Sequence, residues 1–440
     1  MRAYFLKLHQ KIICFSKRPF VLNVLTLVTG TAASQAITMA FMPLITRIYG
    51  PEEYGIQGVF ITVAGVMATI AALTYPAAII LPKTDGDAMG IVHLSICVSI
   101  AMSLFAAVLL FICGDEILSF LRAKEILAFM YLIPVAMVVS VFGNVTGQWL
   151  IRKKAFLLTA KVTALQSLTI NFFKVGLGVV NSTATTLIVI NVFGGVLSAG
   201  MMAFGYRKIH VLEKRPIEKP KRQLNISSIA KKYYDFPLLR APQVFINAIS
   251  HNLPVLMFSM YFGPASVGFY LIAFSVLGAP SIIISGSVMQ VFYPRINEAI
   301  QRGEDVRKLI IKATLGLTLA GAPAFLIVIF AGPVIFEFIL GSEWRMAGAY
   351  AQWLSVWIFF QYINKPAVAA IPALRIQRGL LVYEIFSAFA KVLAIFIGYV
   401  IYNSDIVAVA IFSVFGAVMY AVLILWVVAL SSDVNTARKI

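Results

Sequence analysis

The sequence predicts an all-α integral membrane protein with about twelve transmembrane helices, in two parallel six-helix bundles around a central cavity. Composition, a series of apolar runs and an internal repeat carry this prediction. Hydrophobic residues make up 60% of the 440 residues and charged residues only 12%, and the mean hydropathy is +0.91. Soluble proteins contain about 45–50% apolar and about 25% charged residues, so much of this chain's surface must face lipid. A soluble enzyme, a nucleic-acid-binding module and a disordered scaffold are excluded.

Twelve apolar runs are long enough to cross a membrane. A helix needs about 20 apolar residues to span a hydrocarbon core of about 30 Å. The first run is too long for the apolar region of a signal peptide, which has about 7–15 residues, so we expect an uncleaved first span. The runs lie at 21–46, 54–81, 90–112, 126–151, 156–180, 185–206, 237–262, 266–293, 309–332, 346–371, 379–402 and 405–430.

Lysine and arginine are distributed unevenly between the loops that separate these runs. With the amino terminus in the cytoplasm, the inner segments carry 28 of the 36 Lys and Arg residues and the outer loops carry four. Cytoplasmic loops of membrane proteins are rich in these residues, so we expect both termini to be cytoplasmic. The same asymmetry explains the net charge of +18 without a nucleic-acid partner.

These runs and charges predict the domain organisation. We expect an amphipathic segment on the inner leaflet, an N-terminal lobe of six spans, a basic cytoplasmic linker, a C-terminal lobe of six spans and a cytoplasmic tail. Their ranges are 1–20, 21–206, 207–236, 237–430 and 431–440.

The two lobes contain an internal repeat. The motif Tyr-Gly-Pro-Glu-Glu-Tyr-Gly at 49–55 matches Phe-Gly-Pro-Ala-Ser-Val-Gly at 262–268, 213 residues later. Proline ends a helix and glycine permits a tight reversal, which suits a corner at a membrane surface. Six spans per half make the repeats parallel. Transporters built this way place their substrate site between the halves, which predicts a central cleft.

One lysine lies near the middle of a predicted span. A charged side chain at mid-bilayer costs roughly 2.5–3.5 kcal/mol, so each one needs a partner or water. Lys391 is about twelve residues from either end of the span at 379–402, which is too far for its ammonium to reach a surface. Two interpretations stay open, a structural pair with neighbouring groups or a cationic lining of the cleft. Glu384, seven residues earlier on nearly the same face, is a candidate for ion coupling.

Two further lysines lie nearer the ends of one span, where reaching the surface and lining the cleft both stay open. Lys161 and Lys174 are thirteen residues apart and point about 140° away from each other on a helix, so we do not expect one shared pocket.

Polar stripes mark the first span of each lobe. Arg240, Asn247 and His251 follow the spacing i, i+7 and i+11, which places them on one helical face. Ser34 and Thr38 occupy the corresponding positions of the first span. Both stripes suit a shared central cavity, and hydrogen bonding between helices is the alternative.

The sequence lacks several kinds of catalytic pattern. No paired carboxylates suit glycosyl transfer, no P-loop motif is present, and the three cysteines have no metal-ligand spacing. We therefore expect no cofactor and no metal. An ion gradient, the substrate gradient or a partner must supply the energy. Cations outnumber acids within the spans, which favours an anionic substrate.

Three segments of the N-terminal half carry a family resemblance. They are residues 23–37, 78–83 and the corner Pro-Leu-Ile-Thr-Arg-Ile-Tyr-Gly-Pro-Glu-Glu-Tyr-Gly at 43–55. These segments resemble bacterial O-antigen and capsule oligosaccharide flippases of the multidrug/oligosaccharidyl-lipid/polysaccharide exporter superfamily. The resemblance covers residues 20–90 closely and the rest in topology. It implies that Arg47 and Lys83 are functional residues, although Arg47 also suits a role in stabilising the corner.

The resemblance implies a function. Such proteins move undecaprenyl-diphosphate-linked oligosaccharide units from the inner to the outer leaflet of the bacterial plasma membrane by alternating access, with proton or sodium coupling left open. The expected partners are the lipid-linked oligosaccharide and membrane lipids, with a polysaccharide polymerase and a chain-length regulator as candidates. The alternatives are an ion-coupled multidrug exporter of the same superfamily and a membrane glycosyltransferase or polymerase. The short outer loops argue against the last class.

Overall fold

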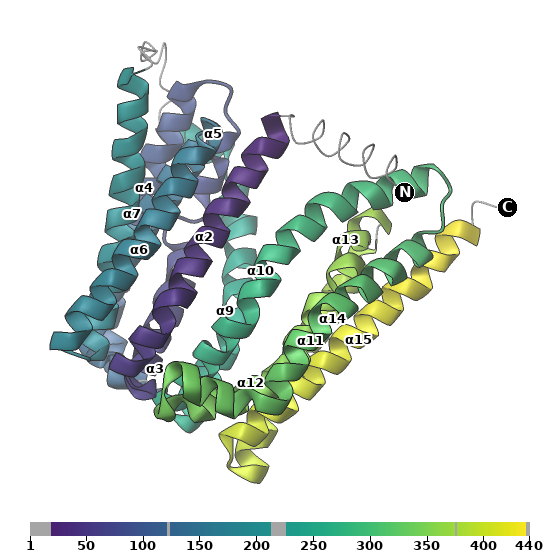
Figure 1. Ribbon diagram of the computed structural model, residues 1–440. Helices are drawn as coiled ribbons and strands as arrows, with labels where there is room; N and C mark the ends of the chain where they lie inside the picture. Colours follow the sequence, from purple (N-terminus) through teal and green to yellow (C-terminus); the bar gives the residue numbers. More distant parts are fainter. Residues whose placement is uncertain (1–18, 121–123, 213–225, 375, 437–440) are drawn as a thin grey trace. The chain divides into compact units, whose positions relative to one another are not determined.

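The computed structural model describes residues 19–120, 124–212, 226–374 and 376–436 (Figure 1). Within these ranges the chain forms helices joined by short turns and contains no strand. The predicted all-α class is therefore confirmed. Most of the amphipathic segment expected at 1–20, much of the basic linker and the end of the tail lie outside the described residues.

Every predicted span contains helix. The helices and short helical turns are α2 (Pro19–Ile48), α3 (Pro51–Ile70), η1 (Tyr75–Ile80), α4 (Asp85–Phe120), η2 (Lys124–Phe129), α5 (Leu132–Arg152), α6 (Phe156–Val180), α7 (Ala184–Leu212), α8 (Ile226–Lys232), η3 (Phe236–Arg240), α9 (Ala241–Phe262), α10 (Pro264–Gln301), α11 (Val306–Leu340), η4 (Ser342–Trp344), α12 (Arg345–Ile363), α13 (Lys365–Leu374), α14 (Gln377–Tyr402) and α15 (Asp405–Thr436). In the described part of the chain, nine helices are long and apolar enough to cross a membrane. A multi-pass membrane protein is thereby supported, and the count of twelve spans stays a prediction.

The described residues form two compact units. The first comprises 19–48, 60–120 and 124–252, and the second comprises 49–59 and 253–436. Helices α3 and α9 each contribute residues to both units. The predicted lobes at 21–206 and 237–430 stay predictions.

The corners of the internal repeat meet in the second unit. Helices α3 and α10 begin at the two motif prolines, Pro51 and Pro264. A Cβ atom on Gly55 would overlap the carbonyl group of Pro264, and a Cβ atom on Gly268 would overlap the carbonyl oxygen of Pro51. The contact is reciprocal and follows the offset of 213 residues. The repeated glycines therefore allow the two helix backbones to touch.

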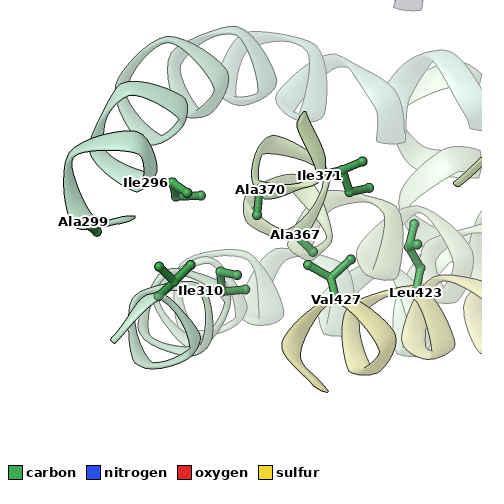
Figure 2. Packing of buried hydrophobic residues seen from close by; sticks show 9 residues of the cluster. Ile296, Ala299, Ile310, Ala367, Ala370, Ile371, Leu423 and Val427 are labelled. Carbon is green, nitrogen blue, oxygen red and sulfur yellow. The ribbon is translucent and has the colours of Figure 1, made fainter. Parts of the chain in front are cut away.

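An apolar cluster joins four helices of the second unit (Figure 2). Ala367, Ala370 and Ile371 of α13 are buried in the cluster, and the small side chains of the two alanines let neighbouring helices approach closely. The other fully or nearly fully buried members are Ile296, Ala299, Val306, Ile310, Leu423 and Val427.

Helix α11 begins after Asp305, where a hydrogen bond from the backbone N–H of Lys308 holds the pKa of the Asp305 carboxyl below its usual value.

A half-buried carboxylate connects three helices of the second unit at the start of α15. Asp405 Oδ2 accepts hydrogen bonds from the hydroxyl groups of Tyr350 in α12, at 2.7 Å, and Ser266 in α10, at 3.0 Å. Its Oδ1 accepts the backbone N–H of Ile406 at 2.8 Å. Bonds to a charged acceptor are stronger than bonds between neutral groups.

We expect Asp405→Ala to lower the free energy of unfolding by about 3 kcal/mol, because two hydroxyl donors in the protein interior lose their acceptor. Tyr350→Phe removes only one of these bonds, and we expect it to cost about 1 kcal/mol. Unfolding of the purified variants in detergent measures both values. Equal stability of wild type and Asp405→Ala would show that the carboxylate does not hold these helices together.

Candidate functional site

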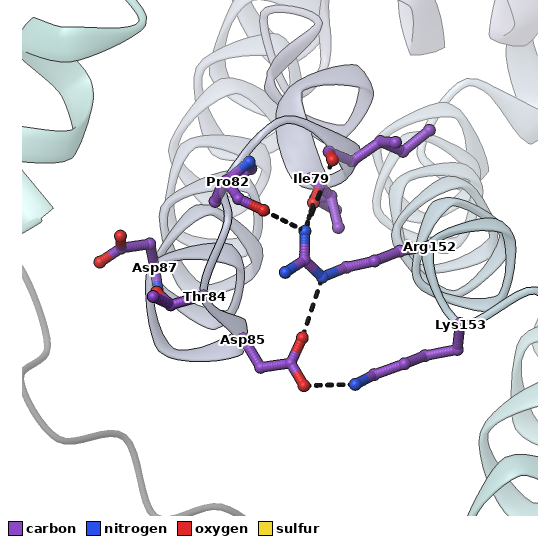
Figure 3. A network of polar contacts seen from close by, with 8 residues as sticks. Ile79, Pro82, Thr84, Asp85, Asp87, Arg152 and Lys153 are labelled. Atoms are coloured by element: carbon purple, nitrogen blue, oxygen red, sulfur yellow. Dashed lines mark hydrogen bonds and ion pairs between the residues drawn. The ribbon is translucent and has the colours of Figure 1, made fainter.

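A network of polar contacts fixes the loop that carries Lys83 (Figure 3). The Arg152 guanidinium donates to the carbonyl oxygen of Pro82 at 2.6 Å, to that of Ile79 at 3.2 Å, and to Asp85 Oδ1 at 3.0 Å. Lys153 also pairs with Asp85. This network ties the end of α5 to the start of α4. Lys83 itself is exposed, so its ammonium is available at the surface of the first unit.

Hydrogen bonds join α2 and α6 across a polar seam in the first unit. The hydroxyl groups of Ser34 and Ser167 contact each other. Asn171 Nδ2 donates to the carbonyl oxygen of Ser167 at 2.7 Å and reaches Thr38 Oγ1 at 3.5 Å. Ser34 and Thr38 therefore take part in contacts between helices, the alternative raised by the sequence. Lys174 follows Asn171 by one turn and is half-buried.

The sequence reasoning missed Ser167 and Asn171. Their spacing of four residues places them on one face of α6 with Lys174 nearby. This spacing is the sequence pattern that could have identified them. The opposite end of α6 differs, since Lys161 is exposed. Lys161 and Lys174 therefore lie in different surroundings.

The predicted stripe, which we call the α9 stripe, runs from Arg240 at the end of η3 into α9, and its side chains are exposed. Arg240, Asn247 and His251 are all exposed, and all belong to the first unit. Polar and cationic groups on a membrane helix require water, headgroups or polar partners around them. An exposed stripe of this kind suits contact with a hydrated ligand.

A π-helical turn contains the first residue of this stripe. Residues Phe236–Arg240 form the turn, and the backbone N–H of Ala241 bonds to the carbonyl oxygen of Phe236. The same oxygen accepts the hydroxyl of Thr74 at 3.1 Å. The Arg240 guanidinium lies 5.6 Å from the ring centroid of Phe236. Turns of this type are frequent at functional sites, and this one ends at Arg240.

Lys391 lies among aromatic rings of the second unit. Its Nζ atom is 5.5 Å from the ring centroid of Trp357 in α12 and 5.8 Å from that of Tyr420 in α15. Its side chain is half-buried, whereas Glu384 is exposed. The faces of these two rings are therefore the partners of the Lys391 charge, and the sequence analysis did not identify them.

The predicted residues are divided between the two units. Lys391 and Glu384 belong to the second unit. The first unit contains Ser34, Thr38, Arg47, Lys83, Lys161, Lys174, Arg240, Asn247 and His251. Arg47 is exposed near the end of α2. Among the described residues, no group of three His, Cys, Asp or Glu side chains could hold a metal ion.

Comparison with known families places these features in context. The sequence profile described as "Polysaccharide biosynthesis protein" matches residues 44–349, which is more than half of the chain. The chain belongs to this family. A curated relative is the succinoglycan biosynthesis transport protein ExoT of Rhizobium meliloti (strain 1021), 22% identical over 324 residues. That alignment covers 72% of this chain and 61% of the relative, so the chain spans less than two thirds of its length.

Solved structures with the same fold are membrane transporters. An inward-facing multidrug resistance transporter of the MATE family, in the MOP superfamily, superposes with a TM-score of 0.72 at 13% identity, covering 93% of this chain and 99% of that one. The lipid II flippase MurJ in an inward closed conformation gives 0.69 at 13% identity, covering 93% and 90%. The likeness to these transporters shows a shared fold, and the profile match shows membership of the polysaccharide biosynthesis family.

Proposed function

We propose that the protein is a flippase that moves undecaprenyl-diphosphate-linked oligosaccharide repeat units of a surface polysaccharide from the inner to the outer leaflet of the plasma membrane. The exposed stripe Arg240, Asn247 and His251 on α9, in a chain of the polysaccharide biosynthesis family, is the observation that supports this best. We propose that both termini are cytoplasmic, and that a polymerase and a chain-length regulator act on the product.

The headgroup is the part of such a substrate that cannot cross the membrane without a protein. A polyprenyl tail can remain in lipid, but a diphosphate and sugars cannot cross about 30 Å of hydrocarbon unaided. Arg240 offers a fork of N–H donors that matches phosphate oxygens, and Asn247 offers amide groups that can bond to sugar hydroxyls. The ammonium of Lys174 adds a second cation within the same unit.

Alternating access explains how such a site serves both leaflets. The internal repeat provides two halves that can rock, and binding must stay weak enough for release. Glu384 is our candidate for proton or sodium coupling. It is exposed near one end of the apolar stretch Val382–Tyr402.

The second candidate is an ion-coupled exporter of cationic drugs, which the MATE-like fold favours. Acidic groups would favour a cationic substrate, and the α9 stripe carries Arg240 and His251 instead. A glycosyltransferase or polymerase finds no support in the family or the fold.

Deletion of the gene in its native host tests the proposal. We expect loss of the surface polysaccharide and accumulation of single lipid-linked repeat units on the inner leaflet. A plasmid copy of the gene should restore the polysaccharide. Lipid-linked units that still reach the outer leaflet in the deletion strain would contradict the proposal.

A further inference from the structure

Two aromatic rings from separate helices enclose the ammonium of Lys391. Trp357 belongs to α12 and Tyr420 to α15, and their ring centroids lie 5.5 and 5.8 Å from Nζ. The faces of indole and phenol rings carry negative partial charge and attract cations within about 6 Å. We call these two rings the aromatic cage.

The cage is held in place by contacts that do not involve Lys391. The Trp357 ring lies 4.9 Å from the ring of Phe412 and 6.0 Å from that of Phe274. Gly416 has no side chain to displace the indole, and a Cβ atom there would lie 2.5 Å from the Trp357 ring. Trp357 is only 6% exposed. The rings therefore stay in position when the lysine is replaced.

The Tyr420 ring is also held by a contact that does not involve Lys391. Gln361, one turn after Trp357, donates from Nε2 to the Tyr420 hydroxyl at 3.2 Å. This bond joins α12 to α15 beside the cage. The Tyr420 ring is thus fixed at its hydroxyl end while its face remains directed at the ammonium.

Ring faces contact the Lys391 ammonium, whereas Glu384 acts on its charge electrostatically without an ion-pair contact. In the part of the chain that the structure describes, no acidic group makes an ion pair with Lys391. Glu384 is seven residues earlier and exposed. Pairs of ring faces without an acid are also the way proteins bind small organic ammonium ligands.

We infer that the aromatic cage is a binding site for organic ammonium ions that the chain fills with its own Lys391. The tethered ammonium occupies the space and repels a second cation, and it acts as a specificity residue that excludes cationic ligands from the second unit. This inference is independent of the lipid-linked substrate, because it concerns binding by the protein alone.

Lys391→Ala tests the inference directly. The substitution removes three methylene groups and the ammonium, which together correspond to n-propylammonium. We expect the full-length variant in detergent to bind n-propylammonium with millimolar affinity, seen by calorimetry and as a rise in its unfolding midpoint. The neutral analogue n-propanol should bind at least tenfold more weakly, and wild type should not respond to the amine.

Three further variants show whether the cage carries the binding. Lys391→Arg and Lys391→Met keep the cage filled, so neither should bind the amine. Adding Trp357→Leu to Lys391→Ala removes one ring face and should weaken binding about 3–30-fold. The inference is overturned if Lys391→Ala responds no more than wild type, or if the double variant keeps the full affinity.

The same amine tests the inference if the Lys391→Ala variant folds poorly. If Lys391→Ala gives little folded monomer, n-propylammonium added during extraction should raise the yield, and n-propanol should not. Equal yields with the amine and the alcohol would also overturn the inference.

Discussion

Replacement of Gly55 by valine is expected to prevent stable folding of the second unit. The Cβ of any other residue at this position would overlap the carbonyl group of Pro264, and the obstacle is backbone. A change of rotamer cannot relieve such a clash, so α3 and α10 must separate. We expect a loss of roughly 3–5 kcal/mol in the free energy of unfolding, measured on purified protein in detergent.

Gly65 provides the matched control within the same helix. No atom lies within 4 Å of a Cβ placed on Gly65, so Gly65→Val should leave stability nearly unchanged. Gly268→Val should behave like Gly55→Val, because the contact is reciprocal. Equal stability of Gly55→Val and Gly65→Val would mean that the repeated corners do not pack as described.

Loss of the Arg240 side chain is expected to reduce polysaccharide export about 10–100-fold while the protein still inserts into the membrane. Hydrogen bonds to a charged group contribute about 1.5–3 kcal/mol, and Arg240 is the guanidinium of the exposed α9 stripe. The side chain is exposed and contacts the ring of Phe236, so its removal should cost little stability. Quantification of surface polysaccharide and of membrane-inserted protein measures both effects in Arg240→Ala.

Lys312→Ala serves as the control for charge. Lys312 is also exposed, but it lies on α11 in the second unit and is not part of the stripe. Arg240→Lys should recover part of the export, since it keeps the charge and loses the planar fork. Wild-type export by Arg240→Ala would remove this residue from the site.

The fold was predictable because periodic apolar runs require little tertiary information. Each run contains helix, and the motif at 49–55 and its copy at 262–268 mark the starts of α3 and α10. The predicted span at 346–371 is divided, because α12 ends at Ile363 and α13 begins at Lys365. Lys365 and Pro366 interrupt the apolar pattern there.

The site was predictable only in part, because its partners come from distant segments. The stripe of Arg240, Asn247 and His251 follows from helical spacing. The rings around Lys391 come from helices that no local pattern links to α14. The π-helical turn before α9 accepts a bond from the Thr74 hydroxyl at the Phe236 carbonyl oxygen, and no local pattern predicts this tertiary contact.

Reconstitution into sealed liposomes is the most direct measurement of the proposed activity. A polyprenyl-diphosphate-linked oligosaccharide, placed in both leaflets, can be probed from outside with a sugar-modifying enzyme that cannot enter. Proteoliposomes of the wild-type chain are expected to make nearly all of this lipid accessible, whereas those of Arg240→Ala and protein-free liposomes should leave about half protected. The proposal that this chain carries such headgroups across the bilayer would be contradicted if half of the lipid stayed inaccessible to the enzyme in proteoliposomes of the folded wild-type protein, under proton and sodium gradients of either direction.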